Sequence, residues 1–246
     1  MVISIDSEWI ENTDINNKND KQDCEINAFK RMAPRIKKKY LKLKFILTGD
    51  ALYTTTPMID ICKENNLFYI FNLKKNRLKN VYEEFQDNVN YENEVSISNY
   101  SLSSNINFKN NFVNTFSYEE TVNGKTTKFK YITNLNVKNS NIVYIVQMGR
   151  KRWKIENEGF NEQKNGTYNI SHLCSRFENA LKIHYLLIQL AHTIRQLFEL
   201  GSLIYKEVEN FINKKEVSTN ITTKLTSSLN TNLENLDLNF QLRFDD

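Results

Sequence analysis

With 246 residues, the chain is long enough for one large domain, or for one domain with a subsidiary insert. Apolar residues make up 40% of it and aromatic residues 12%, which excludes wholesale disorder and favours a globular core. The formal net charge of +4 permits a nucleic-acid partner without requiring one, so the case for such a partner depends on where the charges cluster.

Neither a zinc site nor a membrane segment is indicated. No C-x-x-C pair or Cys/His ligand spacing occurs among the cysteines and histidines, which are Cys24, Cys62, Cys174, His172, His184 and His192. The N-terminus lacks the pattern of a signal peptide, and no apolar run approaches the roughly 20 residues of a membrane helix. We expect a soluble protein of the reducing cytoplasm, with structural histidines and no membrane partner.

The chain begins with a strand-like alternation of residues over Val2–Ile10. After a polar loop, Lys21–Tyr40 places apolar residues at helical spacing, and Pro34 is expected to kink this helix. The apolar run Lys44–Asp50 then predicts a buried central strand that ends in Gly-Asp.

A second helix and strand follow at once. Thr56 as N-cap and Pro57 at the first helical position begin a helix that runs to about Asn65. Leu67–Leu73 has the composition of another strand and leads into a basic cluster. The order strand, helix, strand, helix, strand predicts an α/β sheet.

The second half begins with a polar region. Short alternating pieces and the turn Asn123-Gly124 predict a small β-rich insert over about 80–125, after which Lys128–Asn134 resumes the main sheet. A helix that carries Glu156 follows, and a long amphipathic helix spans about Phe177–Leu200. We therefore expect one domain and one polar tail, residues 1–205 and 206–246.

Asp50 is the first candidate for chemistry. It follows an apolar strand, so its carboxylate is expected at the C-terminal edge of a parallel sheet, where ligands and metals gather in open α/β folds. Gly49 before it lets another group approach closely. The alternative is that Asp50 only ends the strand or caps a turn.

Glu156 is the second candidate. Arg152 lies four residues before it and Gly159 three residues after it, which gives one helix face of arginine, glutamate and a small residue. A helix interior is a rigid mount for a metal-binding carboxylate. The alternative is an ordinary surface Arg–Glu pair, worth a few tenths of a kcal/mol.

Two such acids in a basic frame suit metal-dependent cleavage of a polyanion. Two-metal phosphoryl transfer holds its ions about 4 Å apart on carboxylate oxygens, and Mg²⁺ or Mn²⁺ would be the cofactor. Three carboxylates are the common minimum for such a site. Asp50 and Glu156 leave one ligand to find, and Asp6 in the first strand-like segment is the obvious candidate.

Basic residues surround both acids and could bind phosphates. They are Lys74, Lys75, Arg77, Arg150, Lys151, Arg152, Lys154 and Lys164. Trp153 among them has two possible roles, an anchor in the core, which we prefer, or a platform on which a splayed base stacks.

Taken together, these residues resemble the DDE transposases of bacterial insertion sequences, in particular the branch with a Tyr-x2-Arg-x3-Glu-x6-Lys signature. Arg152 and Glu156 match this signature, whereas Gly149 stands at the tyrosine position, Gln163 at the lysine position, and Lys164 one residue late. The sequences of four further segments also resemble this family. They are residues 7–12, 21–25, 49–53 and 152–161. The resemblance covers about residues 1–204.

The resemblance implies a ribonuclease H-like mixed sheet with flanking helices and a β-rich insert. In such a fold three strands precede the first helix, and the first acid lies on the first strand. Only Val2–Ile10 precedes the Lys21–Tyr40 helix here, so we expect this chain to lack the first two strands and the first catalytic Asp. Asp6 would then lie at the wrong place in the sheet, and the gene would be shortened at its start or decayed.

The resemblance implies metal-dependent cleavage and strand transfer at insertion-sequence ends. Asp50 and Glu156 would be the catalytic, metal-binding acids, and DNA contacts would come from Lys74, Lys75, Arg150, Arg152 and Lys164. The partners would be terminal inverted repeats, target DNA and a second copy in a homodimer on DNA. Two alternatives remain open: an inactive remnant that only binds DNA, and another ribonuclease H-like nuclease.

Overall fold

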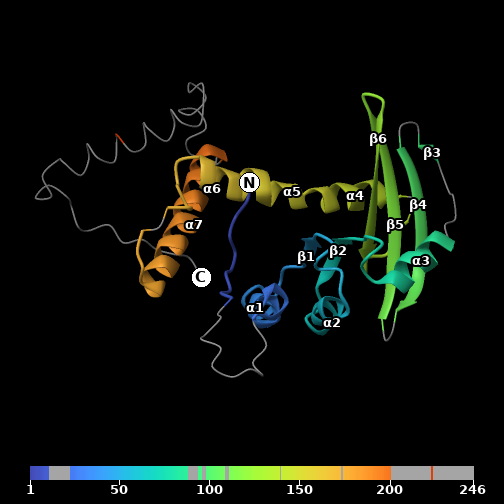
Figure 1. The fold of residues 1–246 in the computed structure, drawn as a ribbon, viewed down its shortest axis with the longest axis horizontal. Coiled ribbons are helices and arrows are strands. Elements are labelled where there is room, and N and C mark those ends of the chain that lie inside the picture. Colours follow the sequence, from blue (N-terminus) through green and yellow to red (C-terminus); the bar gives the residue numbers. More distant parts are fainter. Residues whose placement is uncertain are drawn as a thin grey trace, which may run out of the picture. The chain divides into compact units, whose positions relative to one another are not determined.

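The computed structural model describes residues 1–10, 23–87, 94–95, 98–108, 111–138, 140–172 and 174–200, together with residue 223. The described residues fall into two compact units, Ile5–Glu156, and Met1–Ser4 with the residues from Asn157 onward. The larger unit is built on one mixed sheet of six strands in the order β1-β2-β6-β5-β4-β3 (Figure 1). This is the α/β class that the sequence predicted.

The strands of the sheet differ in direction. β1 (Ile46–Gly49) and β2 (Phe68–Asn72) are parallel, with Gly49 opposite Phe71. β6 (Lys125–Thr133) runs antiparallel beside β2, and the antiparallel order continues through β5 (Asn111–Val122) to β4 and β3. The last two strands are Ser98–Phe108 and Glu94–Val95. The insert and the main sheet are therefore one continuous sheet.

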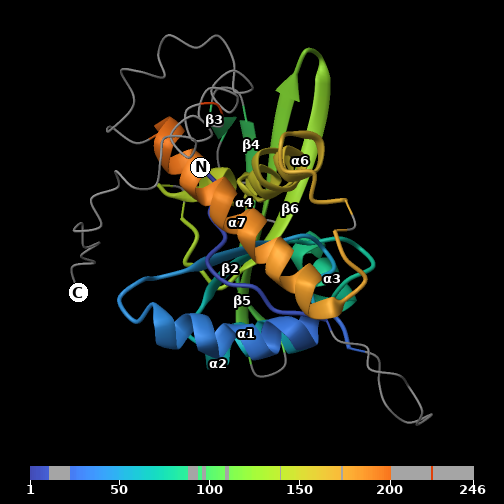
Figure 2. The same cartoon turned by 90° about the vertical axis from the view of Figure 1, so that its left-hand side faces the viewer.

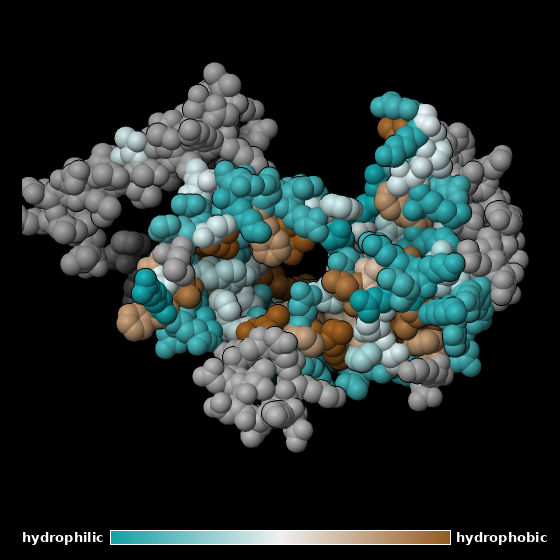
Figure 3. Space-filling view, viewed as in Figure 1, coloured by the Kyte–Doolittle hydropathy of each residue, from teal (hydrophilic) through white to brown (hydrophobic). Residues whose placement is uncertain are grey.

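The β5–β6 hairpin turns at Asn123-Gly124, as predicted. Asn123 has φ 50° and Gly124 has φ 76°, the positive values that a tight two-residue hairpin turn requires. Hydrophilic side chains cover most of the projecting end of this hairpin, with an apolar spot at the tip (Figure 3). Val122 is the exposed apolar residue there.

Alternate residues of the central strands face two separate cores. Tyr69, Phe71 and Ile132 join the core under α1 (Glu25–Lys39), α2 (Thr56–Glu64) and α3 (Lys79–Asp87). Ile70 and Tyr131 join the core under α4, on the other face. α1 and α2 lie side by side in both ribbon views (Figure 1, Figure 2). The period-2 pattern of β2 and β6 thus produces three layers, helices, sheet and helix.

The N-terminal segment is not a strand, and this corrects the prediction for Val2–Ile10. Residues 1–10 have no strand partner among the described residues. From Ile5 onward the segment is bound to α1 instead: Arg35 pairs with Asp6 and Glu8, and Arg31 pairs with Glu8. Alternation alone does not make a strand, because a strand needs a neighbour for its backbone hydrogen bonds.

The predicted Glu156 helix is four consecutive helical pieces. They are α4 (Ile142–Arg150), α5 (Arg152–Lys154), a π-helical turn η1 (Ile155–Phe160) and α6 (Asn161–Asn165). The second predicted helix begins one residue early, since Thr55 is its N-cap and Thr56 its first residue. Pro34 lies inside α1.

In the smaller unit the long helix α7 (Glu178–Leu200) follows α6. The side-chain amide of Gln196 on α7 makes two hydrogen bonds of 2.6 Å with the backbone N–H and C=O of Val2. No described helix is long and apolar enough to cross a membrane. The predicted tail, 206–246, lies outside the described residues except for residue 223.

Candidate functional site

Asp50 lies where the sequence predicted, immediately after β1 at the C-terminal edge of the parallel pair. Its Oδ1 accepts a hydrogen bond of 2.8 Å from the backbone N–H of Leu52, so it also caps the turn that follows. Because β2 runs parallel to β1, the exposed Lys74 and Lys75 leave the sheet at the same edge. An acid and two lysines therefore share one edge of the sheet.

The strand end before Asp50 is tightly packed. A Cβ at Gly49 would lie 2.9 Å from Cδ1 of Phe71 and 3.0 Å from Cβ of Tyr53, which explains why glycine precedes Asp50. Tyr53 donates a hydrogen bond of 3.0 Å to Glu25. Burial, this hydrogen bond and the charges of Glu25 and Asp50 raise the pKa of Tyr53 to about 12. Tyr53 thus stays neutral beside Asp50 at physiological pH.

Glu156 lies in the π-helical turn, and its carboxylate is half-exposed. Arg152 donates a hydrogen bond of 2.5 Å to it across one turn, from a guanidinium that is mostly buried. The same guanidinium lies 4.6 Å from the centre of the Trp153 ring. The Arg–Glu pair weighed as an alternative does form, and it fixes the direction of the acid. Single π-helical turns inside α-helices occur frequently at functional sites.

Gly149, at the tyrosine position of the signature, is a close contact between α4 and the sheet. A Cβ there would lie 3.0 Å from Cε1 of Tyr131 and 3.1 Å from Cγ2 of Ile70. The ring of Tyr131, brought by β6, occupies this space. Burial raises the pKa of Tyr131, while the charges of Arg150 and Arg152 act in the opposite direction. A tyrosine at position 149 would have no room.

Gln163, at the lysine position, is buried against α7. Its side-chain amide exchanges two hydrogen bonds of 3.0 Å with the amide of Gln189, and its Nε2 lies 3.0 Å from Nδ1 of His192. His192 is itself buried, which fits the structural role expected of it. Lys164, the next residue, is exposed. The described structure therefore explains why an amide, and not a lysine, stands at position 163.

The π-helical turn explains why Lys164 lies one residue beyond the lysine position of the signature. A turn closed by i→i+5 hydrogen bonds holds about one residue more than the 3.6 residues of an α-helical turn. Lys164 lies one residue beyond the signature position, and η1 lies between Glu156 and Lys164 in the chain. Counted in helical turns, the interval from Glu156 to Lys164 is therefore close to the Glu-x6-Lys interval of a regular α-helix.

The remaining predicted residues differ in their surroundings. Arg150 pairs with Glu120 at 2.9 Å and lies 5.6 Å from the centre of the Phe129 ring, so it anchors α4 to the sheet. Trp153 is 53% exposed, and the prediction that it anchors the core is wrong.

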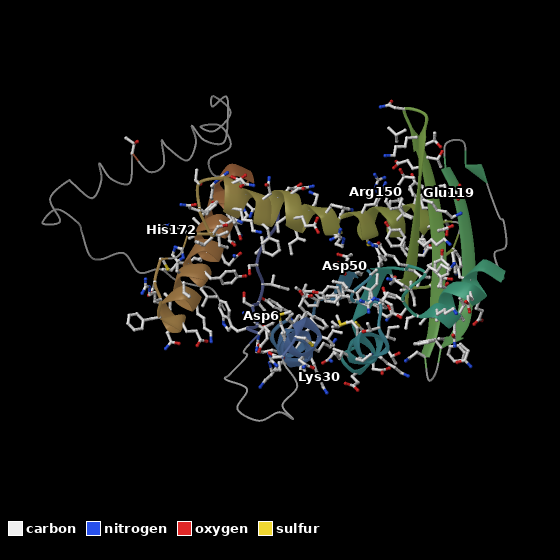
Figure 4. All side chains as sticks on the ribbon, in the orientation of Figure 1. Asp6, Lys30, Asp50, Glu119, Arg150 and His172 are labelled. Carbon is white, nitrogen blue, oxygen red and sulfur yellow. The ribbon has the colours of Figure 1, made fainter. Side chains whose placement is uncertain are left out.

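The described residues form no cluster that would hold a metal ion. Nowhere in the described part of the chain do three His, Cys, Asp or Glu side chains come together as ligands for a metal ion. Asp6 accepts hydrogen bonds from Arg35 and from the backbone of Ser7, and in Figure 4 it lies beside α1 whereas Asp50 lies at the end of β1. Asp50 and Glu156 have the right chemistry for a hard cation, but two carboxylates do not complete its shell.

A comparison with known protein families gives one match. A family model described as a transposase DDE domain matches residues 19–194, well over half of the chain. The chain belongs to the transposase DDE domain family. Its mixed sheet with flanking helices is consistent with the ribonuclease H-like fold of that family, as predicted. A search among curated proteins gives no match.

Two features of this transposase-family domain were missed by sequence reasoning. The first is Tyr131, whose position opposite Gly149 depends on strand pairing. The second is the polar cluster of Gln163, Gln189 and His192. The only signal for the cluster was the presence of polar residues within the apolar pattern of the long helix, which by itself does not identify the partner.

Proposed function

We propose that the chain is a DNA transposase of the cytoplasm, which binds the ends of an insertion sequence for metal-dependent cleavage and strand transfer. The observation that carries this proposal is the signature helix. Arg152 and Glu156 form a hydrogen-bonded pair, and Lys164 is exposed. Lys164 lies one residue beyond the signature position, and the wider turn η1 accounts for this extra residue. Asp50 at the parallel strand ends is the second acid.

Each residue has a distinct role in this proposal. Asp50 and Glu156 are the carboxylates for Mg²⁺ or Mn²⁺, whose chemistry is to polarise a phosphodiester and activate the attacking oxygen. Arg152 directs the Glu156 carboxylate, and Lys74, Lys75 and Lys164 bind DNA phosphates through exposed ammonium groups. Arg150 is a weaker DNA ligand because Glu120 already neutralises it.

Trp153 supports a DNA partner in a different way. Trp153 is 53% exposed, and its ring lies 4.6 Å from the Arg152 guanidinium, so an aromatic face stands beside a cation at the surface. A base that leaves the duplex stack could cover this ring, with a gain of about 1–3 kcal/mol per stacked base.

A binding-only protein is the second candidate. It is favoured by one observation, that no three His, Cys, Asp or Glu side chains among the described residues come together to hold a metal ion. Such a protein would occupy DNA ends through the same lysines without cutting them. A general ribonuclease H-like nuclease differs from both in having no preference for terminal repeats.

Nicking of DNA separates these functions. Labelled terminal-repeat DNA and unrelated DNA are incubated with the protein and Mg²⁺ or Mn²⁺, and nicked products are counted. Asp50→Asn and Glu156→Gln keep the acceptor atoms that bond Leu52 and Arg152, so the fold is retained while the charge is lost. Glu158→Gln, in the same turn, is the matched control.

Metal-dependent nicking that both variants abolish and the control keeps would support the transposase. Binding of terminal repeats without any nicking would establish the binding-only function. Equal nicking of unrelated DNA would favour the general nuclease. No DNA binding at low salt would overturn all three.

The salt dependence of DNA binding tests the lysines. Each phosphate contact contributes about 0.9 to the slope of log K against log salt. We expect Lys74→Gln, Lys75→Gln and Lys164→Gln each to lower the slope by about that amount. Lys128→Gln is the control, since Lys128 is already paired with Glu119. An unchanged slope in all three variants would remove them from the DNA interface.

A further inference from the structure

A cavity of about 350 Å³ lies between α2 and the ends of three strands. Phe68 and Tyr69 line it from the start of β2, Asn111 and Phe112 from the start of β5, and Asn134 from the end of β6. All residues that line it belong to the larger unit, Ile5–Glu156. Its volume is at the low end of the range for small-molecule sites.

This cavity is separate from the candidate site. Phe68 is the first residue of β2, whereas Asp50 follows the last residue of β1, and the two strands are parallel. The cavity and Asp50 therefore lie at opposite ends of the parallel pair. A ligand of the cavity needs neither DNA nor metal, so its failure and the failure of the proposed activity are separate results.

Tyr69 carries a buried hydroxyl without a hydrogen-bond partner among the described residues. The residue lines the cavity and is only 2% exposed. Its backbone is paired on both sides, since the N–H donates to Asn134 at 3.0 Å and the C=O accepts from Thr133 at 2.5 Å. An unpartnered buried hydroxyl is costly, and a bound acceptor removes that cost.

Two amides of the lining are already paired. The side chain of Asn134 also donates to the Leu67 carbonyl at 3.0 Å, so both ends of this amide are used. The side chain of Asn111 donates to Asp60 at 2.9 Å. These bonds fix two walls of the cavity and leave the Tyr69 hydroxyl for a ligand.

The charges around the cavity favour a neutral ligand. Burial raises the pKa of the Cys62 thiol to about 12, and burial together with Cys62 raises the pKa of Tyr69. Both groups are therefore neutral at physiological pH, and Cys62 is no nucleophile. Lys63 is the one charged residue of the lining, and it is exposed, so water solvates its ammonium group.

The remaining lining is mainly apolar and partly aromatic, with the side chains of Ile59, Leu67, Phe68 and Phe112. Aromatic side chains pack well against flat rings. Water is a poor occupant of such a space, because one molecule takes about 30 Å³ and needs roughly two to four polar partners. The cavity is much larger than one water molecule and offers few polar groups.

We propose that the cavity binds a small, neutral, planar molecule that accepts one hydrogen bond from the Tyr69 hydroxyl. The flat shape suits the phenylalanine rings, the absence of charge suits the interior, and the acceptor pairs the hydroxyl. Aromatic ketones and amides belong to this class of ligand. Phosphates and other ions do not, since their charge would lose its hydration inside the cavity.

Two probes of the same shape test the hydrogen bond. Acetophenone has a carbonyl oxygen where α-methylstyrene has a CH2 group. Each probe is titrated into the full chain without DNA or metal, and the isoleucine methyl groups are followed by NMR. We expect acetophenone to bind with a dissociation constant of about 0.1–1 mM. Nuclear Overhauser contacts with the Ile59 methyl groups would locate it in the cavity.

Tyr69→Phe removes the hydroxyl and tests its role. The affinity for acetophenone divided by that for α-methylstyrene is expected to fall about tenfold in this variant, because the hydration of the probes cancels in the comparison. Tyr131→Phe is the matched control. It removes a hydroxyl from a tyrosine that is also 2% exposed but lies in the other core, so the ratio should not change.

Phe112→Ala tests the aromatic wall. We expect both probes to bind about fivefold more weakly, with an unchanged ratio, because the wall contacts the ring and not the acceptor. Phe112 is 71% exposed, so the variant is expected to keep its fold. If Tyr69→Phe did not fold, Phe112→Ala and the contacts with Ile59 would decide the inference.

Three outcomes would overturn the inference. The first is no saturable binding of acetophenone up to about 10 mM, which would mean that water or the chain itself fills the cavity. The second is an affinity ratio that Tyr69→Phe leaves unchanged. The third is binding with contacts to other isoleucine methyl groups and none to Ile59.

Discussion

The signature helix is attached to its surroundings in two different ways along its length. At Gly149 it lies against the side chains of Tyr131 and Ile70, and the fit depends on the absence of a side chain. At Gln163 it is joined to α7 through paired amides and His192. The first attachment limits the size of the residue at position 149. The second requires a hydrogen-bonding side chain at position 163. Both positions depart from the family signature, and each departure has its own local partner.

Restoring the tyrosine at position 149 should have the largest effect. Gly149→Tyr forces a side chain into a space where even a Cβ would lie 3.0 Å from Tyr131, so the helix must move from the sheet. We expect a loss of more than about 3 kcal/mol in the free energy of unfolding, at the upper end of overpacking effects. Urea unfolding followed by circular dichroism measures this loss.

Gly149→Tyr with Tyr131→Ala should recover part of the loss, because it removes the ring that occupies the space. If Gly149→Tyr alone were as stable as the natural chain, the volume-selective attachment would be refuted.

Restoring the lysine at position 163 should have the next largest effect. Gln163→Lys buries an ammonium group and leaves Gln189 without its amide partner. We expect a loss of about 2 kcal/mol, moderated because the lysine stem can bend toward water. The reverse exchange at the next position, Lys164→Gln, is the control and should change stability by less than about 0.5 kcal/mol. Equal effects at both positions would contradict the hydrogen-bonded attachment.

The smallest expected effect is on stability at alkaline pH, which should depend on the attachment at Gly149 and not on the attachment at Gln163. Burial raises the pKa of Tyr131 above its unfolded value of 10.0. The stability from this group is therefore complete below pH 10 and is lost as the pH rises through the folded pKa. Tyr131→Phe should lessen the loss of unfolding free energy between pH 8 and about pH 11. Gln163→Met should leave that loss unchanged, since amides do not titrate, and the opposite result would reverse the assignment.

Elements with a strong local pattern were predicted from the sequence. β1, β2 and α7 agree with their apolar runs within a few residues, and the Asn123-Gly124 turn follows from its residue types. The segment Val2–Ile10 was wrong because its alternation is a property of side chains, while its backbone finds no strand partner among the described residues. Local pattern predicts a segment, and only its neighbours make it a strand.

The residues of the candidate site also fall into those that local sequence patterns predict and those that depend on distant parts of the chain. Asp50 follows from the end of an apolar strand, and Arg152 with Glu156 follows from helical spacing. The π-helical turn has no periodic signature in residues, so the interval to Lys164 looked irregular. The burial of Gln163 depends on its contact with α7, which lies far away in the sequence.

The two hydrogen bonds between Gln196 and Val2 determine which substitutions position 2 can accept. The side-chain amide of Gln196 bonds only the backbone N–H and C=O of residue 2, as a neighbouring strand would. The side chain of residue 2 takes no part in these two hydrogen bonds. The identity of residue 2 is therefore nearly free to drift among nineteen of the amino acids. Proline is the exception, because it lacks the N–H that the glutamine accepts. Over many generations, Gln196 should be preserved while the residue it holds changes.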